Sequence, residues 1–369
     1  MSASEPRLVA FAPYGRSAGS SRVRVFEWID HLGLDAVVHV FTEENAAGFK
    51  QIGRHPLRSI RRHRELAATE IDPDDVVLIH RELSPLSDGS EEERLLRAGA
   101  RGIVDLDDGL QWDWGQGGRA RRLQPKTPKV LRMVKAADVV IAGNDLIAEW
   151  AGQHASDVVV IPSCVEPSHY QQKFSYELHD PPIIGWIGSA STERHLTSWS
   201  AALLEAHDQY GAEVIVVGQP TGCMGDMEEI SRRVEWTESS ASSLPAEWDV
   251  GIMPLPDGLL ERSKCAYKIC QYGAASLPAV ASPVGVNAEA GSIEAPAGSS
   301  GHELFRILGA PAEERRVMSA VLSKNVQQRF AYRSNASAFR AAVFGTAATP
   351  RSDSHLPVLE HLPSGDEQW

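Results

Sequence analysis

Two lysines capable of binding an anion stand at a predicted helix start in the second half of the chain. Lys264 and Lys268 lie four residues apart, after an apolar strand predicted at 249–253 and at the start of a helix predicted at 265–275. Residues at this spacing share a helix face, and the N–H groups and dipole of a helix start favour negative charge. A further strand completes a βαβ unit, which binds ligands beyond the carboxyl ends of its strands. The pattern therefore predicts a diphosphate site, with Arg262 in the preceding loop; ordinary surface lysines are the alternative.

A second anion-binding pattern follows the apolar strand predicted at 183–187. Gly188 and Ser189 form the turn after it, and Thr192 stands at the start of the next helix. Glycine lets a backbone approach a ligand closely, and hydroxyl groups at a helix start can bind phosphate oxygens or simply cap the helix. A nucleoside diphosphate could bind at this turn, although such turns are common.

Three carboxylates come at the end of a predicted strand in the first half of the chain: Asp105, Asp107 and Asp108. Carboxylates are the ligands that Mg²⁺ prefers, so a metal site is one interpretation. Contacts with sugar or acceptor hydroxyls are the other. Trp112 and Trp114 follow closely and offer flat faces to a sugar or a ring-bearing acceptor, or else pack in the core.

Strands and helices alternate along the chain. Short apolar runs between turn signals are typical of parallel strands buried on both faces. Such runs are predicted at 7–13, 36–41, 75–79, 102–106, 138–142 and 157–162, and again at 183–187, 212–217, 233–236, 249–253 and 279–282. The clearest helices are predicted at 20–32, 91–100 and 128–137.

Residues 163–182 interrupt this alternation with several prolines. We therefore predict an α/β fold with two Rossmann-like parallel-sheet domains. The predicted divisions are an N-terminal domain at 1–165, a linker at 166–182, a C-terminal domain at 183–330, a helix at 331–345 and a poorly ordered tail at 346–369.

The composition is that of an ordinary soluble globular protein. The 369 residues suffice for two domains, and a net charge of -13 argues against nucleic acid as the main partner. No apolar run approaches the roughly 20 residues that span a bilayer, and the N-terminus lacks the pattern of a secretion signal. The four cysteines form no C-x-x-C pair. We expect a cytoplasmic protein with reduced thiols.

Residues 249–286 resemble the donor-binding segment of the retaining glycosyltransferases of family 4. The matching string is MPLP followed by K-x3-K-x2-QY-x-A-x2-LP-x-VAS-x-VG. Residues 137–152 and 158–170 look like the last strands of that family's N-terminal domain, and 183–196 like the first turn of its C-terminal domain. The resemblance extends over 7–345 and implies the GT-B fold, in which the two domains face a deep cleft.

The resemblance implies transfer of a sugar from a UDP-, GDP- or dTDP-linked donor with retention of configuration. The donor-binding residues would be Gly15, Arg16, Gly188, Ser189, Thr192, Arg262, Lys264, Lys268 and Gln271. Lys268 would stabilise the leaving diphosphate. A phosphate oxygen of the leaving group is expected to deprotonate the acceptor, so no separate base is required. GT-B enzymes do not generally need a catalytic metal, so no cofactor is expected.

The same resemblance places the acceptor against the N-terminal domain. In the family, a glycine-containing loop such as that from Gly15 to Gly19 closes on the donor phosphate or sugar. Asp107 and Asp108 are interpreted as catalytic-site carboxylates that contact the acceptor or the sugar, and Gly19 and Trp112 as further acceptor contacts. The arginines after the loop, at positions 22 and 24, either face this site or cover an ordinary helix face.

The chain departs from the family at two acidic positions. Many members carry a Glu-x7-Glu pair, and here Ser263 stands at the first position and Gln271 at the second. Gln271 can still accept a hydrogen bond from a ribose hydroxyl through its carbonyl oxygen. Either Glu261 or Asp257 could replace the first Glu, and the sequence does not distinguish them. Phosphate charge would then fall mainly on the lysines.

A basic segment holds five arginines between Arg54 and Arg64. A solvated helix face is the plain interpretation; an anionic acceptor or a membrane surface are the others. Two other classes remain for the whole chain: a non-hydrolysing sugar-nucleotide epimerase, and a nucleotide-sugar-binding protein with weak catalysis. The departures from the family favour a natural-product or small-metabolite acceptor, attacking through oxygen, nitrogen or sulfur. A homodimer is possible.

Overall fold

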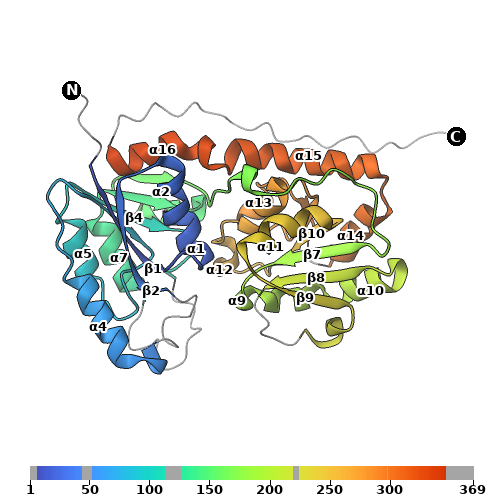
Figure 1. Ribbon diagram of the computed structural model, residues 1–369, viewed down its shortest axis with the longest axis horizontal. Coiled ribbons are helices and arrows are strands. Elements are labelled where there is room, and N and C mark those ends of the chain that lie inside the picture. Colours follow the sequence, from blue (N-terminus) through green and yellow to red (C-terminus); the bar gives the residue numbers. More distant parts are fainter. Residues whose placement is uncertain (1–5, 44–51, 113–125, 219–223, 297, 346–369) are drawn as a thin grey trace.

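The computed structural model describes residues 6–43, 52–112, 126–218, 224–296 and 298–345. It contains two six-stranded parallel sheets, one from each half of the chain, with helices on both faces of each sheet (Figure 1). The prediction of an α/β fold with two Rossmann-like units is confirmed.

The N-terminal sheet has the strand order β2-β1-β3-β4-β5-β6. Its strands are β1 (Leu8–Tyr14), β2 (Ala36–Thr42), β3 (Val76–His80), β4 (Arg101–Leu106), β5 (Val139–Ala142) and β6 (Val158–Val160). All residues of β3 and β5 are buried, as expected of strands covered on both faces. One face packs on α2 (Glu27–Leu32) and α16 (Tyr332–Phe344), and the other on α4 (Pro56–Ala67), α5 (Ser90–Leu96), α7 (Lys126–Ala136) and α8 (Asp145–Ala151).

The C-terminal sheet has the order β12-β11-β10-β7-β8-β9. Its strands are β7 (Ile183–Ile187), β8 (Glu213–Gly218), β9 (Ser231–Glu235), β10 (Val250–Met253), β11 (Ala279–Ala281) and β12 (Ile293–Glu294). One face packs on α13 (Tyr267–Ala274) and α15 (Ala312–Arg329), and the other on α10 (Ser200–Tyr210) and α14 (Ser300–Gly309). The strand order reverses between β1 and β3 in the first sheet and between β10 and β7 in the second. Ligands of such sheets bind beyond the carboxyl ends of the strands at these reversals.

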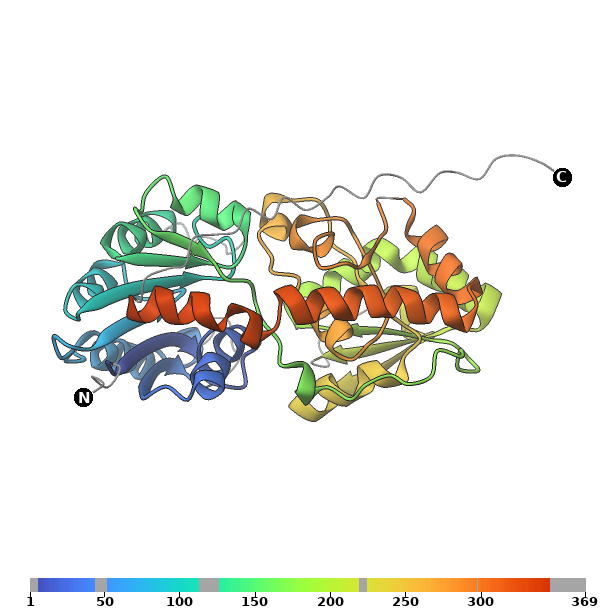
Figure 2. The same cartoon turned by 90° about the horizontal axis from the view of Figure 1, so that it is seen from above.

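The last two helices join the two units. Figure 2 shows α15 along the C-terminal unit and α16 along the N-terminal unit. Phe339 of α16 stacks on Trp28 of α2 with 4.3 Å between ring centroids, and the Tyr332 hydroxyl donates to the Val23 carbonyl at 2.9 Å. The Val165 N–H donates to the Phe330 carbonyl at 2.8 Å. The two segments that cross between the units are thus hydrogen-bonded to each other.

Two differences between predicted and observed helices concern segments near the predicted ligand-binding residues. The helix predicted at 20–32 is divided into α1 (Gly19–Ser21), a wider π-type turn at Arg22–Phe26, and α2. The helix predicted at 265–275 begins at Tyr267, because Ala266 before it adopts a left-handed conformation with φ of 50°. The described helices include none that is long and apolar enough to cross a membrane.

Candidate functional site

The predicted donor residues gather where the C-terminal sheet reverses its strand order. Gly188 follows β7, and Lys268 lies in the first turn of α13, after the neighbouring strand β10. The Lys268 ammonium lies 3.4 Å from the Thr192 hydroxyl of α9 (Ala190–Glu193) and 5.3 Å from the centre of the Trp186 ring. A Cβ at Gly188 would lie 2.4 Å from Trp186 and 2.7 Å from Lys268 Cε. Glycine is therefore required for Lys268 to reach the end of β7.

Lys268 is a half-buried cation with no carboxylate bonded to it in the described part of the chain. Burial, with a further contribution from the charge of Lys264, lowers its pKa to about 7. Part of its side chain remains accessible to solvent. An anion bound here would counteract this shift, because opposite charge favours the protonated ammonium. The arrangement is suited to an anionic ligand such as a diphosphate.

Glu261 stands beside this cluster, whereas Asp257 does not. The Glu261 carboxylate is buried and lies 3.8 Å from His195 Nε2. The pKa of His195 is lowered to about 4 by burial and by the charges of Arg194, Lys264 and Lys268, so the ring is neutral at pH 7. Asp257 is exposed and pairs with Arg262 at 2.6 Å. Of the two carboxylates that the sequence left open, the structure places Glu261 near the lysines.

This ion pair also changes the interpretation of Arg262. Its guanidinium is on the surface and donates twice to the Asp257 carboxylate, at 2.6 and 2.9 Å. The sequence grouped Arg262 with Lys264 and Lys268 as a phosphate ligand. Because its charge is already balanced and exposed, we leave Arg262 out of the proposed donor site.

Gln271 and Ser263 occupy the positions of the family's two acidic residues. Gln271 lies one turn after Lys268 on α13 and is buried, with its side chain hydrogen-bonded to the Tyr170 hydroxyl. Ser263 is buried and accepts a hydrogen bond from the Gly109 N–H at 3.0 Å. Ser263 therefore contributes to the contact between the two units, while one polar group of the Gln271 amide is already bonded to Tyr170.

The carboxyl edge of the N-terminal sheet carries a buried network around His80, the last residue of β3. The His80 ring nitrogen Nδ1 lies 2.7 Å from the Asp105 carboxylate, and Nε2 lies 2.7 Å from the Ser20 hydroxyl. Arg24 donates to Asp105 at 3.1 and 3.2 Å and to the Ile161 carbonyl at 2.8 Å. Burial would raise the pKa of Asp105, but Arg24 and His80 hold it below its usual value. Asp105 is therefore an ionised, fully engaged carboxylate.

Asp107 is held by Arg81, a residue that the sequence did not identify. Arg81 donates to the two Asp107 oxygens at 2.5 and 2.9 Å. Its guanidinium, together with His80, keeps the pKa of Asp107 low against the effect of burial. Arg81 has φ of 63°, and its N–H donates to the Asp105 carbonyl at 2.9 Å. Asp107 was expected to contact a ligand directly; here its carboxylate is bound by arginine and by the Ser20 hydroxyl at 3.0 Å.

Asp108 and Trp112 lie at the contact between the two units. Asp108 is half-buried, and its Oδ1 lies 3.5 Å from the Ser263 hydroxyl. A Cβ at Gly109 would lie 2.5 Å from the Trp112 ring and 2.7 Å from Ser263 Oγ, so glycine allows both to approach. Trp112 packs on this turn; Trp114 lies outside the described residues.

Further hydrogen bonds link the same segments. Cys265 Sγ donates to the Asp107 carbonyl at 3.1 Å, and the Asn144 amide donates to the Ser263 carbonyl at 2.6 Å. The loop that carries Lys264 therefore rests on the loop that carries Asp107 and Asp108. The loops that carry Lys264 and Asp108, which are distant in sequence, are thus brought to one region.

The glycine loop after β1 lies at the edge of this region. Gly15 packs on Glu43, whose carboxylate would lie 2.1 Å from a Cβ at position 15. Arg16 is exposed and pairs with Asp30 at 2.6 Å, so it is directed to α2. Gly19 has open space around its Cα and precedes Ser20. Of the loop residues predicted to bind ligand, Arg16 is already paired within the N-terminal unit.

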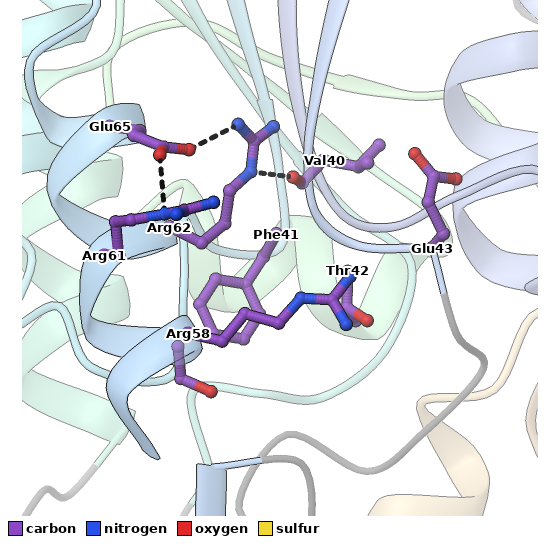
Figure 3. A pocket seen from close by; sticks show the side chains of 9 residues that line it. Val40, Phe41, Thr42, Glu43, Arg58, Arg61, Arg62 and Glu65 are labelled. Atoms are coloured by element: carbon purple, nitrogen blue, oxygen red, sulfur yellow. Dashed lines mark hydrogen bonds and ion pairs between the residues drawn. The ribbon is translucent and has the colours of Figure 1, made fainter. Parts of the chain in front are cut away.

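The basic segment forms α4 and one wall of a pocket at the end of β2. The pocket is lined by Val40, Phe41, Thr42, Glu43, Arg58, Ser59, Arg61, Arg62 and Glu65 (Figure 3). Arg62 donates to the Val40 carbonyl at 2.8 Å, and both Arg61 and Arg62 pair with Glu65 at 3.2 Å. Part of this charge is thus balanced locally, and Arg58 adds a further exposed guanidinium.

His80, Arg81 and Ser20 are the site residues that the sequence did not indicate. They come from β3 and from the segment after β1, and nothing in their spacing links them. One signal in the sequence could have pointed to His80, because it ends an apolar run predicted to be a buried strand. The structure pairs this strand with the one that carries Asp105.

Comparisons with known proteins identify the fold. No family model matches the chain, and no curated protein sequence does. Solved structures match: sucrose-phosphate synthase from Thermosynechococcus elongatus at TM-score 0.63 and 14% identity, over 90% of this chain and 97% of that one. Anabaena HepE in complex with UDP and glucose matches at TM-score 0.61 and 12% identity, over 90% of this chain and 98% of that one. A UDP-forming trehalose-phosphate synthase from Burkholderia xenovorans matches at TM-score 0.61 and 15% identity, over 93% of this chain and 100% of that one.

At these identities the likeness concerns the fold. The chain has the two-domain GT-B architecture, as the resemblance in residues 249–286 implied.

Proposed function

We propose that this chain is a glycosyltransferase that moves a sugar from a nucleoside diphosphate sugar to a small-molecule nucleophile. The observation that carries the proposal is Lys268, a half-buried cation beside the Thr192 hydroxyl at the strand reversal of the C-terminal sheet, with no described carboxylate bonded to it. Burial lowers its pKa to about 7. Keeping a cation in such a position is unfavourable for the fold and is explained if an anion binds there.

The diphosphate would lie between the ends of β7 and β10. Lys268 and Thr192 are 3.4 Å apart and would both reach its oxygens, and Gly188 leaves space for it. As the sugar leaves, charge develops on the diphosphate, and a preplaced ammonium stabilises that charge. Glu261 would hold sugar hydroxyls, because it is the carboxylate beside the lysine cluster.

The donor base is proposed to be uracil. The HepE structure that this chain resembles in fold holds UDP and glucose, so uridine nucleotides are the first to test, with GDP and dTDP sugars beside them. The base would bind at the end of β9, where Trp236 follows the strand. The Arg22 guanidinium lies over the Trp236 ring, 4.9 Å from its centre.

The acceptor would bind against the N-terminal unit, at Asp108, Trp112 and Gly19. Asp108 and Trp112 adjoin the loop that carries Lys264, so an acceptor bound there would be next to the transferred sugar. From the resemblance to family 4 we keep retention of the anomeric configuration, and from the departures from that family a small-molecule acceptor of natural-product type.

Metal-independent transfer is part of the proposal. Asp105 and Asp107 are each neutralised by an arginine, Arg24 and Arg81. A cation would have to displace these guanidinium groups to bind the carboxylates. Within the described residues, no cluster of three or more His, Cys, Asp or Glu is arranged to hold a metal ion.

The test is a calorimetric screen of UDP-, GDP- and dTDP-glucose, followed by mass spectrometry with an acceptor library. The proposal expects one nucleotide sugar to bind and its glycosyl group to appear on an acceptor. Conversion of the donor to an epimer without acceptor would identify an epimerase. Binding without any turnover would identify a nucleotide-sugar-binding protein. Absence of binding to all three would refute the proposal.

A further inference from the structure

Arg22 is a buried arginine of the N-terminal unit that meets side chains of the C-terminal unit. It begins the π-type turn at Arg22–Phe26 and is 7% exposed. Such wider turns are frequent at functional sites. The Arg22 guanidinium lies over the Trp236 ring, with 4.9 Å between Cζ and the ring centre, and the side chain is hydrogen-bonded to that of Tyr267 at the start of α13. Arg22 therefore lies at the contact between the two units.

One nitrogen of this guanidinium has no hydrogen-bond partner within the described part of the chain. Nε of Arg22 donates to the Glu27 carboxylate at 3.0 Å, whereas the terminal nitrogen Nη1 is buried and makes no hydrogen bond. A buried N–H without an acceptor is unfavourable, and more so on a charged group. Arginine does not lose its proton in proteins, so ionisation cannot relieve this cost. An acceptor oxygen of a ligand would satisfy the nitrogen.

The unpaired nitrogen lies where the nucleoside of the donor is expected. Trp236 and Glu238 belong to the segment that follows β9, at which the base is proposed to bind. Tyr267, the partner of Arg22 on α13, directly precedes Lys268, at which the diphosphate is proposed to bind. Arg22 thus contacts the C-terminal unit between the proposed positions of the base and the diphosphate.

The surroundings of Nη1 leave it a route to a ligand. The carboxylate nearest to it, that of Glu238, is 4.0 Å away, too far for a hydrogen bond, and its side chain is 75% exposed. Glu238 begins α11 (Glu238–Ser243), so its side chain can turn into solvent and uncover the nitrogen. Trp236 occupies the face of the guanidinium. Arginine can stack through its face and donate hydrogen bonds through its edge at the same time.

Resting on the proposed function, we propose that Arg22 binds the base of the donor, with Nη1 donating to a carbonyl oxygen of uracil. A neutral acceptor suits this position, because the carboxylate of Glu27 already balances the charge of Arg22. The base is then contacted by both units: by the segment after β9 in one and by Arg22 in the other. Nucleotide binding therefore also stabilises the contact between the units.

The test compares a ligand that has the base with one that lacks it. Calorimetry measures the Kd of UDP and of inorganic pyrophosphate for the wild type and for Arg22→Met, in which an apolar side chain of similar length replaces the guanidinium. We expect the Kd of UDP to rise about 10- to 100-fold, the usual range for a hydrogen bond from a charged group. The Kd of pyrophosphate should be unchanged, because this ligand reaches only the lysine side of the site.

A second variant and a matched control separate this role from effects of charge or folding. Arg22→Lys keeps a positive charge beside Glu27 but lacks the second terminal nitrogen, so it should show the same selective loss. It also keeps the test available if Arg22→Met does not fold. Arg329→Met removes a guanidinium that lies over Phe330 at 5.5 Å and pairs with Glu289 at 3.1 Å on the C-terminal unit. This control should change neither Kd.

Three results would overturn the inference. Equal losses of UDP and pyrophosphate would mean that Arg22 acts on the diphosphate or only maintains the fold. Unchanged UDP affinity would mean that the base binds elsewhere. If the wild type prefers UDP to 2′-deoxy-UDP and Arg22→Met binds the two equally, the contact is to the ribose and not to the base.

The outcome for the wild type distinguishes this inference from the proposed function. If the wild type binds GDP or dTDP in place of UDP, the comparison uses that nucleotide, because guanine and thymine also carry carbonyl oxygens. If it binds none of the three, the proposed function itself fails, and the role of Arg22 with it. If it binds one of them and Arg22→Met binds it equally well, only the role of Arg22 fails.

Discussion

Replacing Lys268 by methionine should weaken donor binding and stabilise the free protein at the same time. Methionine keeps the length and apolar contacts of the side chain and removes its charge. A charge-assisted contact contributes about 1.5–3 kcal/mol, so the Kd for UDP-glucose should rise about 10- to 150-fold. Few substitutions at an ordinary surface lysine would have this pair of effects.

The gain in stability follows from the lowered pKa. Lys268 titrates near 7 in the folded chain against 10.5 as its usual value. Between these pH values the unfolded chain binds the additional proton, so wild-type stability rises with pH there, and the full cost is present below pH 7. Each pKa unit corresponds to about 1.4 kcal/mol, which gives an upper limit of about 5 kcal/mol. Because water can reach part of the side chain, we expect Lys268→Met to gain about 1–3 kcal/mol at pH 6, and little near pH 10.

The same pKa predicts how binding depends on pH. UDP-glucose has no titrating phosphate between pH 6 and 8, so its wild-type affinity should fall about tenfold over that range as Lys268 loses its proton. Lys268→Arg is the matched control, because arginine stays charged and should abolish this dependence. Calorimetry measures the change in UDP-glucose affinity, and thermal unfolding measures the change in stability. Unchanged affinity in Lys268→Met, or a loss of stability at pH 6, would refute the reasoning.

Four further predictions concern neighbouring features. Gly188→Ala should weaken UDP binding about tenfold or more in calorimetry, because its methyl group would lie 2.7 Å from Lys268 Cε; unchanged affinity would show that Lys268 is not constrained by this turn. Glu261→Gln should weaken binding of UDP-glucose but not of UDP, whereas Asp257→Asn, at an exposed position, should change neither affinity. If Asp257→Asn weakened UDP-glucose binding and Glu261→Gln did not, Asp257 would be the carboxylate that holds the sugar. Asp108→Asn should lower acceptor turnover in steady-state assays and spare nucleotide binding; equal losses would contradict its place on the acceptor side. Turnover should persist in excess EDTA, and loss restored by Mg²⁺ would show that the carboxylates bind metal.

The sheet architecture was predictable because each buried strand leaves a local trace. The run at 139–142 is apolar throughout and the run at 76–80 is apolar up to His80, and both are buried throughout in the structure. The donor side was partly predictable for the same reason. Lys268 and Gly188 each follow a recognisable strand, and these strands are neighbours in the sheet. Knowing that two residues follow adjacent parallel strands is enough to place them together.

Pairing between charged side chains was not predictable. Arg262 and Lys268 are both cations in one segment, but Asp257 binds the first and no described carboxylate binds the second. Which lysine or arginine meets a carboxylate depends on the path of each loop, and the sequence does not specify it. The same holds for Asp107, whose partner Arg81 adopts a positive φ that its own sequence does not signal.

The buried network around His80 could not be predicted from the sequence for a further reason. Ser20, His80 and Asp105 share no motif, and a serine at a helix start is ordinarily a cap. Their association depends on β1, β3 and β4 lying side by side and ending at one edge. Only the tertiary structure brings the hydroxyl to 2.7 Å from the ring.

We expect the C-terminal sheet to bind a nucleoside diphosphate at its strand reversal. A crystal structure of the chain with UDP tests it most directly. A diphosphate oxygen should lie within hydrogen-bonding distance of Lys268 Nζ and of the Thr192 hydroxyl, beside Gly188. UDP bound instead in the arginine-lined pocket of α4, or at the N-terminal sheet, would contradict it.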